Sequence, residues 1–154
     1  MKRLPTVGHG QARFALAADV MVGERRVRVV DVHLEVRIQM TDRIRQLDPA
    51  VLEERAVIGG DFNTAPWQWV EGIVPLTSTE AVVGQNQAAV LDDYMASREF
   101  AGAIAPDVDT FTLAPFGMRL DNLYARDIPI AATGIERIGG SDHYPIWFDI
   151  DVCN

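Results

Sequence analysis

The sequence predicts a mixed α/β (α+β) fold in a single domain spanning residues 1–154. The length of 154 residues and a hydrophobic fraction of 48% fit one globular core and leave no room for two domains of ordinary size. Short β-branched segments alternate with two stretches in which apolar residues recur at helical spacing. No internal repeat, low-complexity segment or linker divides the chain.

The first two strands are expected at residues 14–22 and 26–34. Both segments are rich in β-branched and apolar residues, and Gly23-Glu24 between them predicts a tight antiparallel turn. The second segment is apolar on both sides towards its end, as is typical of a strand covered on both faces. We therefore expect it to be central in a sheet.

An amphipathic helix is expected from residue 37 to about residue 52, followed by a short buried strand at 56–58. A second helix is expected around residues 88–95. The first helix presents one apolar face, made by Met40, Ile44, Leu47 and Val51. The remaining strands are expected at residues 110–113, 119–126, 130–138 and 144–152.

Charge and composition exclude some classes of function. With 14 Lys and Arg against 22 Asp and Glu, the net charge is −8, which argues against binding nucleic acid or an anionic membrane by charge alone. A phosphate substrate remains compatible, because carboxylates can hold a divalent cation that the phosphate then contacts. No apolar run is long enough for membrane insertion and the N-terminal residues do not resemble a secretory signal, so a cytoplasmic location is expected. The single cysteine, Cys153, can form no internal disulfide.

Four short segments each place an ionisable residue where a predicted strand ends. Such positions are typical of functional sites, because the sheet is rigid and its ends are open. The segments are Val-His-Leu-Glu (32–35), Gly-Asp-Phe-Asn (60–63), Arg-Leu-Asp (119–121) and Ser-Asp-His (141–143).

Residues 60–63 could form a simple turn, since Gly, Asp and Asn are all common in turns. The functional interpretation rests on alternation, which points Asp61 and Asn63 the same way in an extended chain. A carboxylate and an amide at one spot can bind a hard cation or orient a water. Trp67 and Trp69 follow this loop and are expected to cover it.

The other three segments also have structural explanations. Asp142 and His143 could lie in a solvated loop, although a carboxylate beside an imidazole that titrates near neutrality also suits hydrolysis. His33 could be a core histidine satisfied by one hydrogen bond. Asp121 lies in a predicted strand, where burial requires a partner such as Arg119 or a histidine.

In this order, the four segments resemble the endonuclease/exonuclease/phosphatase superfamily, which includes deoxyribonuclease I. The resemblance covers most of the chain, from residue 13 to residue 150, and includes the Tyr-Pro that follows His143. It implies an incomplete four-layer α/β sandwich of the deoxyribonuclease I-like type, with mixed sheets flanked by helices.

The resemblance also implies a phosphodiesterase or nuclease that uses a divalent metal, usually Mg²⁺ with Mn²⁺ as an alternative, and hydrolyses a phosphate ester with water. It assigns His143 as the base and Asp121 as the residue that holds it. Asp142 would be a metal ligand. Asp61 and Asn63 would orient water and phosphate and help to bind the metal, and His33 would contact the phosphate or assist the leaving group.

The sequence departs from the family pattern at its beginning. The family places an Asn and a metal-binding Glu before the segment that contains His33, and neither motif is found here. The chain thus resembles the C-terminal part of the fold, truncated at the N-terminus, and we expect weaker metal binding and reduced activity. Glu35 is one residue that could replace the missing ligand. Without the first part of the fold, an apolar sheet face would lack its cover, which predicts a homodimer through that face.

Two further hypotheses compete with the enzyme. The chain could be a catalytically inactive fragment that dimerises or binds a partner, which the missing Glu favours. It could also be an unrelated binding domain, which requires the motifs to be coincidental and predicts that Asp61, Asn63, Asp142 and His143 lie far apart.

Overall fold

The computed structural model describes residues 1–7, 11–36, 38–51, 55–66, 86–113 and 116–151. Its centre is a six-stranded mixed sheet in the order β1-β2-β3-β4-β8-β5. β3 and β4 run parallel, and the other neighbouring pairs are antiparallel. The strands are β1 (Lys2–Arg3), β2 (Phe14–Val22), β3 (Arg25–His33), β4 (Ala56–Asp61), β8 (Asp121–Arg126) and β5 (Ala101–Gly102). Trp67, Trp69 and Cys153 lie outside the described residues.

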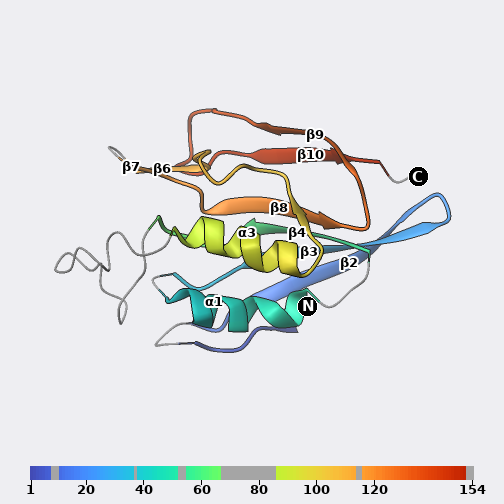
Figure 1. Cartoon of the computed structure of the whole chain (residues 1–154), viewed down its shortest axis with the longest axis horizontal. Coiled ribbons are helices and arrows are strands. Elements are labelled where there is room, and N and C mark those ends of the chain that lie inside the picture. Colours follow the sequence, from blue (N-terminus) through green and yellow to red (C-terminus); the bar gives the residue numbers. More distant parts are fainter. Residues whose placement is uncertain (8–10, 37, 52–54, 67–85, 114–115, 152–154) are drawn as a thin grey trace.

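Helices cover one face of this sheet (Figure 1). They are α1 (Met40–Leu47), which continues into the 3-10 helix η1 (Asp48–Ala50), and α3 (Gln87–Ser97), whose first turn is capped by Asn86. Both predicted helices are confirmed: α1 is shorter than its expected range, and α3 extends beyond its expected range at both ends. The core between helices and sheet includes Val30, Val32, Leu47, Ile58, Leu91, Met95 and Tyr124.

The opposite face of the six-stranded sheet, here called the second face, packs against a small antiparallel sheet of β9 (Ile130–Ile135) and β10 (Ile146–Ile150). This second core contains Val27, Val57 and Ala125 from the large sheet, with Phe148 and Ile150 packed against it. A short hairpin, β6 (Phe111–Leu113) and β7 (Phe116–Met118), lies beside it (Figure 1).

The small sheet covers only part of the second face. Val27 is buried, but Val29 two residues further along β3 is 37% exposed, and Leu16 on β2 is 58% exposed. The prediction that this strand is central is confirmed, because β3 lies between β2 and β4. The prediction that both of its faces are covered is wrong at Val29 and Asp31, because the β9–β10 sheet does not extend over them.

The fold class is therefore a mixed α/β sandwich, as predicted: helices, a large mixed sheet and a small second sheet lie on one another in that order (Figure 1). In the described part of the chain, no helix combines the length and the apolar character that crossing a membrane requires.

Candidate active site

A row of polar side chains crosses the large sheet where β3 and β4 end and β8 begins. His33 is the register partner of Asp61, and Asp61 is the register partner of Asp121. Register partners on neighbouring strands present their side chains on the same face. Alternation along β4 places Asp61 on the same face as Val57, which packs against the β9–β10 sheet. The row therefore lies at one end of the second face, opposite the helices.

His143 reaches this row from the loop that precedes β10. An isolated bridge to Phe111 holds the loop against β6, and the two rings pack edge to face with centroids 4.9 Å apart. The imidazole Nδ1 lies 2.8 Å from Oδ2 of Asp121. The expectation that Asp121 needs a partner is met by His143, although the two residues are far apart in the sequence.

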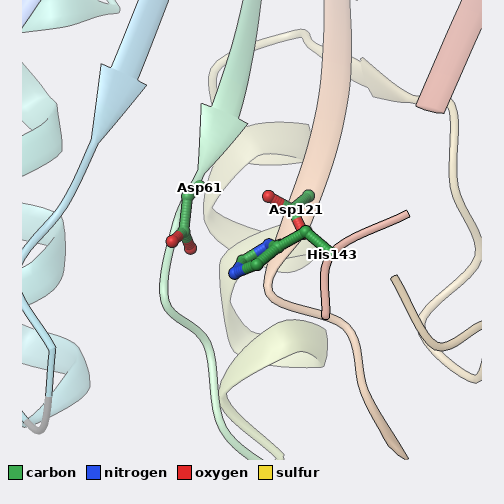
Figure 2. A group of neighbouring side chains, drawn as sticks. All are labelled: Asp61, Asp121 and His143. Atoms are coloured by element: carbon green, nitrogen blue, oxygen red, sulfur yellow. The ribbon is translucent and has the colours of Figure 1, made fainter. Parts of the chain in front are cut away.

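Asp61, Asp121 and His143 form the one candidate metal-binding group found among the described residues. One ligand atom from each residue lies within 4.8 Å of the ligand atoms of the other two. Figure 2 shows the ring of His143 extending from beside Asp121 towards Asp61. The carboxylates of Asp61 and Asp121 are donors that suit Mg²⁺ or Mn²⁺, because these cations prefer carboxylate oxygens. The residues present therefore fit a divalent cation.

Burial and neighbouring charges shift the pKa values of His143 and Asp121. Burial by itself lowers the pKa of His143, but the hydrogen bond with Asp121 and the neighbouring carboxylates outweigh burial and raise it above 6.5. Burial raises the pKa of Asp121, and the charge of Asp61 adds to this effect, although the contact with His143 opposes it. The pKa of Asp121 is thus raised mainly by burial and that of His143 by the neighbouring carboxylates, whose negative charge a cation would compensate.

His33 and Asn63 flank Asp61. Nε2 of His33 is 3.6 Å from Oδ2 of Asp61, and the His33 side chain is 60% exposed, so it faces solvent beside the group. Asn63 has a φ of 53°; its backbone N–H donates to Oδ1 of Asp61 at 2.8 Å, and its side-chain amide donates to the carbonyl of Leu34 at 2.9 Å. Asn63 thus fixes the orientation of Asp61 and joins the ends of β3 and β4.

Asp142 lies beside the site but outside the candidate metal group. It is exposed, and its backbone carbonyl accepts a hydrogen bond of 2.8 Å from the N–H of Thr112. Its charge contributes to the raised pKa of His143. The ligand role that the resemblance gives to Asp142 stays a prediction.

The side chain of Glu35 makes structural contacts. Its side chain is 7% exposed and pairs with Arg13 at 3.2 Å, and it accepts hydrogen bonds from the backbone N–H groups of Gln11 and Val36. It does not belong to the candidate metal group. Glu35 therefore ties the segment before β2 to the end of β3.

Three buried polar residues that we did not single out from the sequence hold the ends of the strands. The guanidinium of Arg43 donates to the carbonyls of Glu35 and Phe62 and, at 3.3 Å, to Gln87. Gln87 in turn accepts from the N–H of Ala65 and donates to the carbonyl of Ile38. One signal was available: Arg43 lies at helical spacing between Met40 and Leu47, on the buried face of the predicted helix.

The third residue, Thr110, accepts hydrogen bonds from the N–H groups of Leu120 and Asp121 at the start of β8.

Arg119, the other partner considered for Asp121, binds residues of other segments. It donates to the carbonyls of Ile104 at 2.6 Å and Ala88 at 2.7 Å, and it pairs with Asp92 at 2.9 Å. These contacts anchor the chain immediately before β8. Arg119 thereby fixes the backbone that presents Asp121 to His143.

Solved structures of similar fold include nucleases and phosphatases. The endonuclease domain of TRAS1, a telomere-specific non-LTR retrotransposon, matches with a TM-score of 0.63 and 14% identity over 91% of this chain and 63% of that chain. The inositol polyphosphate 5-phosphatase domain of SPsynaptojanin, solved with inositol (1,4)-bisphosphate and calcium, has a TM-score of 0.65 and 14% identity over 97% of this chain and 53% of that chain. The 3′ phosphatase NExo from Neisseria, bound to a product DNA hairpin, has a TM-score of 0.59 and 16% identity over 92% of this chain and 65% of that chain.

These likenesses concern the fold. The chain spans between 53% and 65% of the length of these three structures. No curated protein sequence matches it. A sequence profile does match, over residues 25–143, which include all the candidate site residues discussed above. The chain belongs to the endonuclease/exonuclease/phosphatase family.

Proposed function

We propose that this chain is a divalent-metal-dependent phosphoesterase, a phosphodiesterase or nuclease that hydrolyses a phosphate ester by attack of water. The observation that carries this proposal is the convergence of Asp61, Asp121 and His143, whose ligand atoms lie within 4.8 Å of one another. They come from two strands and a loop that are far apart in the sequence. Family membership supports the same reaction class.

The proposed cofactor is Mg²⁺, with Mn²⁺ as the alternative. Asp61 and Asp121 supply carboxylate oxygens, and the family resemblance adds Asn63 and Asp142 as ligands. A bound cation supplies charge stabilisation for a phosphoryl oxygen and for an attacking water. With no glutamate in the candidate group, we expect the affinity for Mg²⁺ to be low.

The protein residues have separate roles in this proposal. His143 accepts the proton of the attacking water, and Asp121 at 2.8 Å orients the ring and stabilises its protonated form. Asn63 orients Asp61 through the hydrogen bond of 2.8 Å from its backbone N–H. His33 contacts the phosphate or the leaving group from the exposed side of the row.

The proposed substrate is a small phosphodiester or a short nucleic acid. The similar structures include a phosphatase of inositol polyphosphates and a 3′ phosphatase bound to a DNA hairpin, which support the phosphate-ester class. A net charge of −8 disfavours long duplex DNA, because the main source of affinity for duplex DNA is a positively charged surface that neutralises its phosphates.

The test is hydrolysis of bis-p-nitrophenyl phosphate and of plasmid DNA with Mg²⁺ or Mn²⁺, and with chelator as control. We expect metal-dependent hydrolysis that His143→Ala lowers by about 10²- to 10⁴-fold, the usual contribution of a general base. Asp93→Asn, which alters an exposed carboxylate of α3, is the matched preparation control and should keep the wild-type rate. Hydrolysis that His143→Ala leaves unchanged would remove His143 from the mechanism.

The exposed part of the second face favours a second candidate function, a dimerising or partner-binding module without activity. Leu16 and Val20 on β2 and Val29 on β3 are all exposed there, and register places Leu16 and Val20 on the same face as Val29. Contiguous exposed apolar side chains drive association. We propose a homodimer in which this face meets its copy, whether or not the site is active.

Light scattering at micromolar concentration tests the dimer. We expect Leu16→Lys to yield a monomer, while Met21→Lys, which changes an exposed apolar residue on the other face of β2, should remain dimeric. Because each copy carries a charge of −8, added salt should strengthen the dimer by screening repulsion. A wild-type monomer would contradict the proposal.

A further inference from the structure

The row of side chains that crosses the ends of β3 and β4 continues over β2 and β1. Ala15 on β2 is the register partner of Val32 on β3. The next residues along these two antiparallel strands are Phe14 and His33, which therefore stand opposite each other. Phe14 is in turn the register partner of Arg3 on β1. Five neighbouring strands thus place one residue each on a single line, and this line ends at Arg3.

The extension of the row lies on the second face of the sheet. Ala15, which follows Phe14, is buried in the core beneath the helices. Lys2, which precedes Arg3, donates to the carbonyl of Pro49 in η1 at 3.1 Å, on the helix side. Because side chains alternate between the faces of a strand, Phe14 and Arg3 point to the opposite face. Phe14 is 43% exposed there, and Arg3 is exposed as well.

We propose that Phe14 and Arg3 form a nucleotide-binding subsite next to the candidate metal group, and that the substrate is a short single-stranded nucleic acid. The reacting phosphate lies at Asp61, the adjoining nucleobase stacks on Phe14, and the next phosphate binds Arg3. This inference rests on the proposed function for the phosphate at the cation. It selects nucleic acid among the phosphate esters that such a site could hydrolyse.

The separation of these residues sets the size of the ligand. Neighbouring strands lie about 4.8 Å apart, so Phe14 is about 10 Å and Arg3 about 14 Å from Asp61 across the sheet. One phosphate group is too small to contact both ends of the row. A ligand that fills the row needs two phosphate groups with a spacer between them, and a nucleotide with a phosphate on each side of its sugar has this form.

The ring of Phe14 favours a nucleobase as the part of the ligand between the phosphates. Every base has a flat π face that stacks on an aromatic side chain, whereas an alkyl chain or a polyol has none. A single exposed aromatic residue needs no functional explanation. Here the ring lies between a basic side chain and the imidazole of His33, which is 60% exposed and leads to Asp61. The position of Phe14 in this row is what points to a ligand.

Arg3 supplies positive charge at the far end of the row in a protein whose net charge is −8. A guanidinium binds phosphate oxygens through two parallel hydrogen bonds, which suits the second phosphate. The apolar residues proposed for the dimer, Leu16, Val20 and Val29, lie nearer the turn between β2 and β3 than the row does. The subsite and the dimer surface therefore use different residues of the second face.

Thymidine 3′,5′-bisphosphate with Mg²⁺ probes the whole row, and inorganic phosphate with Mg²⁺ probes the cation group alone. Neither contains a phosphodiester bond, so a phosphodiesterase does not consume them. Phe14→Leu removes the π face but keeps the apolar bulk, and Phe14→Tyr keeps the π face. Arg3→Gln removes the charge of Arg3. Lys2→Gln is its matched control, because Lys2 carries the same charge on the other face of β1.

Thymidine 3′,5′-bisphosphate should shift the NMR signals of the Phe14 ring protons in the wild type, and inorganic phosphate should not. Phe14→Leu should weaken bisphosphate binding by about 5- to 100-fold, which corresponds to the loss of one base–aromatic stack. Phe14→Tyr should bind the bisphosphate as the wild type does, and Phe14→Leu should keep the wild-type affinity for inorganic phosphate.

Arg3→Gln should weaken bisphosphate binding by about 2- to 5-fold, the usual range for an exposed ion pair, and should make binding less sensitive to salt. Lys2→Gln should change neither quantity. Equal weakening by Arg3→Gln and Lys2→Gln would overturn the placement of the second phosphate at Arg3.

Two other results would overturn the subsite: Phe14 ring signals that the bisphosphate leaves in place, or equal bisphosphate affinity in wild type and Phe14→Leu. Failure of the proposed function has a different signature. In that case the wild type would show no metal-dependent hydrolysis, although the bisphosphate still shifts the ring signals of Phe14.

Discussion

Asp61 and Asp121 stand directly opposite each other on neighbouring antiparallel strands, at the last residue of β4 and the first of β8. Like charges in this position destabilise a sheet. The ring of His143 beside them has a raised pKa and compensates part of the repulsion. A divalent cation would compensate more of it, so the pairing of these two carboxylates links stability to metal binding.

The first prediction is that Mn²⁺ raises the melting temperature of the wild type. A ligand that binds only the folded state at about 100 times its Kd adds about 2.7 kcal/mol of stability. Asp61→Asn should abolish this gain, while Asp93→Asn on the exposed side of α3 should retain it. Calorimetry with increasing Mn²⁺ measures the effect. Equal gains in wild type and Asp61→Asn would place the metal elsewhere.

The second prediction concerns pH. The pKa of His143 is raised mainly by Asp121 against the opposing effect of burial. In Asp121→Asn, we expect NMR titration of the metal-free protein to show a lower pKa for His143. A raised folded-state pKa means that stability from this pair is present below pH 6.5 and is lost as the pH rises through the raised value. The free energy of unfolding of Asp121→Asn should therefore change less than that of the wild type between pH 6.5 and the raised pKa of His143.

A part of the site was predictable because strand ends are visible in a sequence. Three site residues lie at the ends of apolar segments: His33, Asp61 and Asp121. Parallel pairing of β3 with β4 and antiparallel pairing of β4 with β8 then bring these ends together. The pairing of His143 with Asp121 required the family resemblance or the structure, since a loop and a short strand position it.

Other features depend on tertiary contacts that leave no local pattern. Nothing near Glu35 in the sequence shows that Arg13 binds it, because the two residues meet only when β2 and β3 pair. The hydroxyl of Thr110 is likewise important through contacts with residues ten and eleven positions away. The incomplete cover of β3 could not be read from its own apolar pattern, because that pattern is the same whether a second sheet extends over it or not.

The third prediction separates Glu35 from the metal site. Burial alone raises the pKa of Glu35, but hydrogen bonds from Arg13 and from two backbone N–H groups lower it below 4.5 overall. A lowered folded-state pKa stabilises the protein above about pH 4.5, and this stability is lost as the pH falls through the lowered value. Glu35→Gln should therefore cost about 1–2 kcal/mol near pH 7 and less in acid.

Denaturant unfolding at several pH values measures this difference, and Mn²⁺ titration of the same variant completes the test. Because Glu35 pairs with Arg13, the affinity for Mn²⁺ should not change in Glu35→Gln. A loss of Mn²⁺ binding in this variant would show that Glu35 is a ligand after all.

The fourth prediction concerns the guanidinium of Arg43, whose pKa burial lowers to about 10 although the charges of Asp61 and Glu35 oppose this effect. Arg43→Met would leave the carbonyls of Glu35 and Phe62 without their buried donor, which should cost about 3 kcal/mol. Arg45→Met, two residues further along the same helix and exposed, should cost less than about 0.5 kcal/mol. Similar unfolding midpoints for the two variants would contradict this account.

The last prediction follows from how closely β3 and β4 approach beside Asp61. Gly60 has a φ of +129°, and a Cβ added there would lie 2.0 Å from the carbonyl oxygen of Val32 on β3. Gly60→Ala must therefore separate the strands or strain the backbone, and we expect a loss of about 3 kcal/mol or more. Gly139→Ala is the control, because a Cβ there meets no atom within 4 Å. The separation of β3 and β4 in Gly60→Ala should also move Asp61 away from Asp121. The folded fraction of Gly60→Ala should therefore bind Mn²⁺ more weakly, whereas Gly139→Ala should bind Mn²⁺ as the wild type does. Equal stability and equal Mn²⁺ affinity in the two variants would mean that the approach of β3 to β4 does not set the geometry of the site.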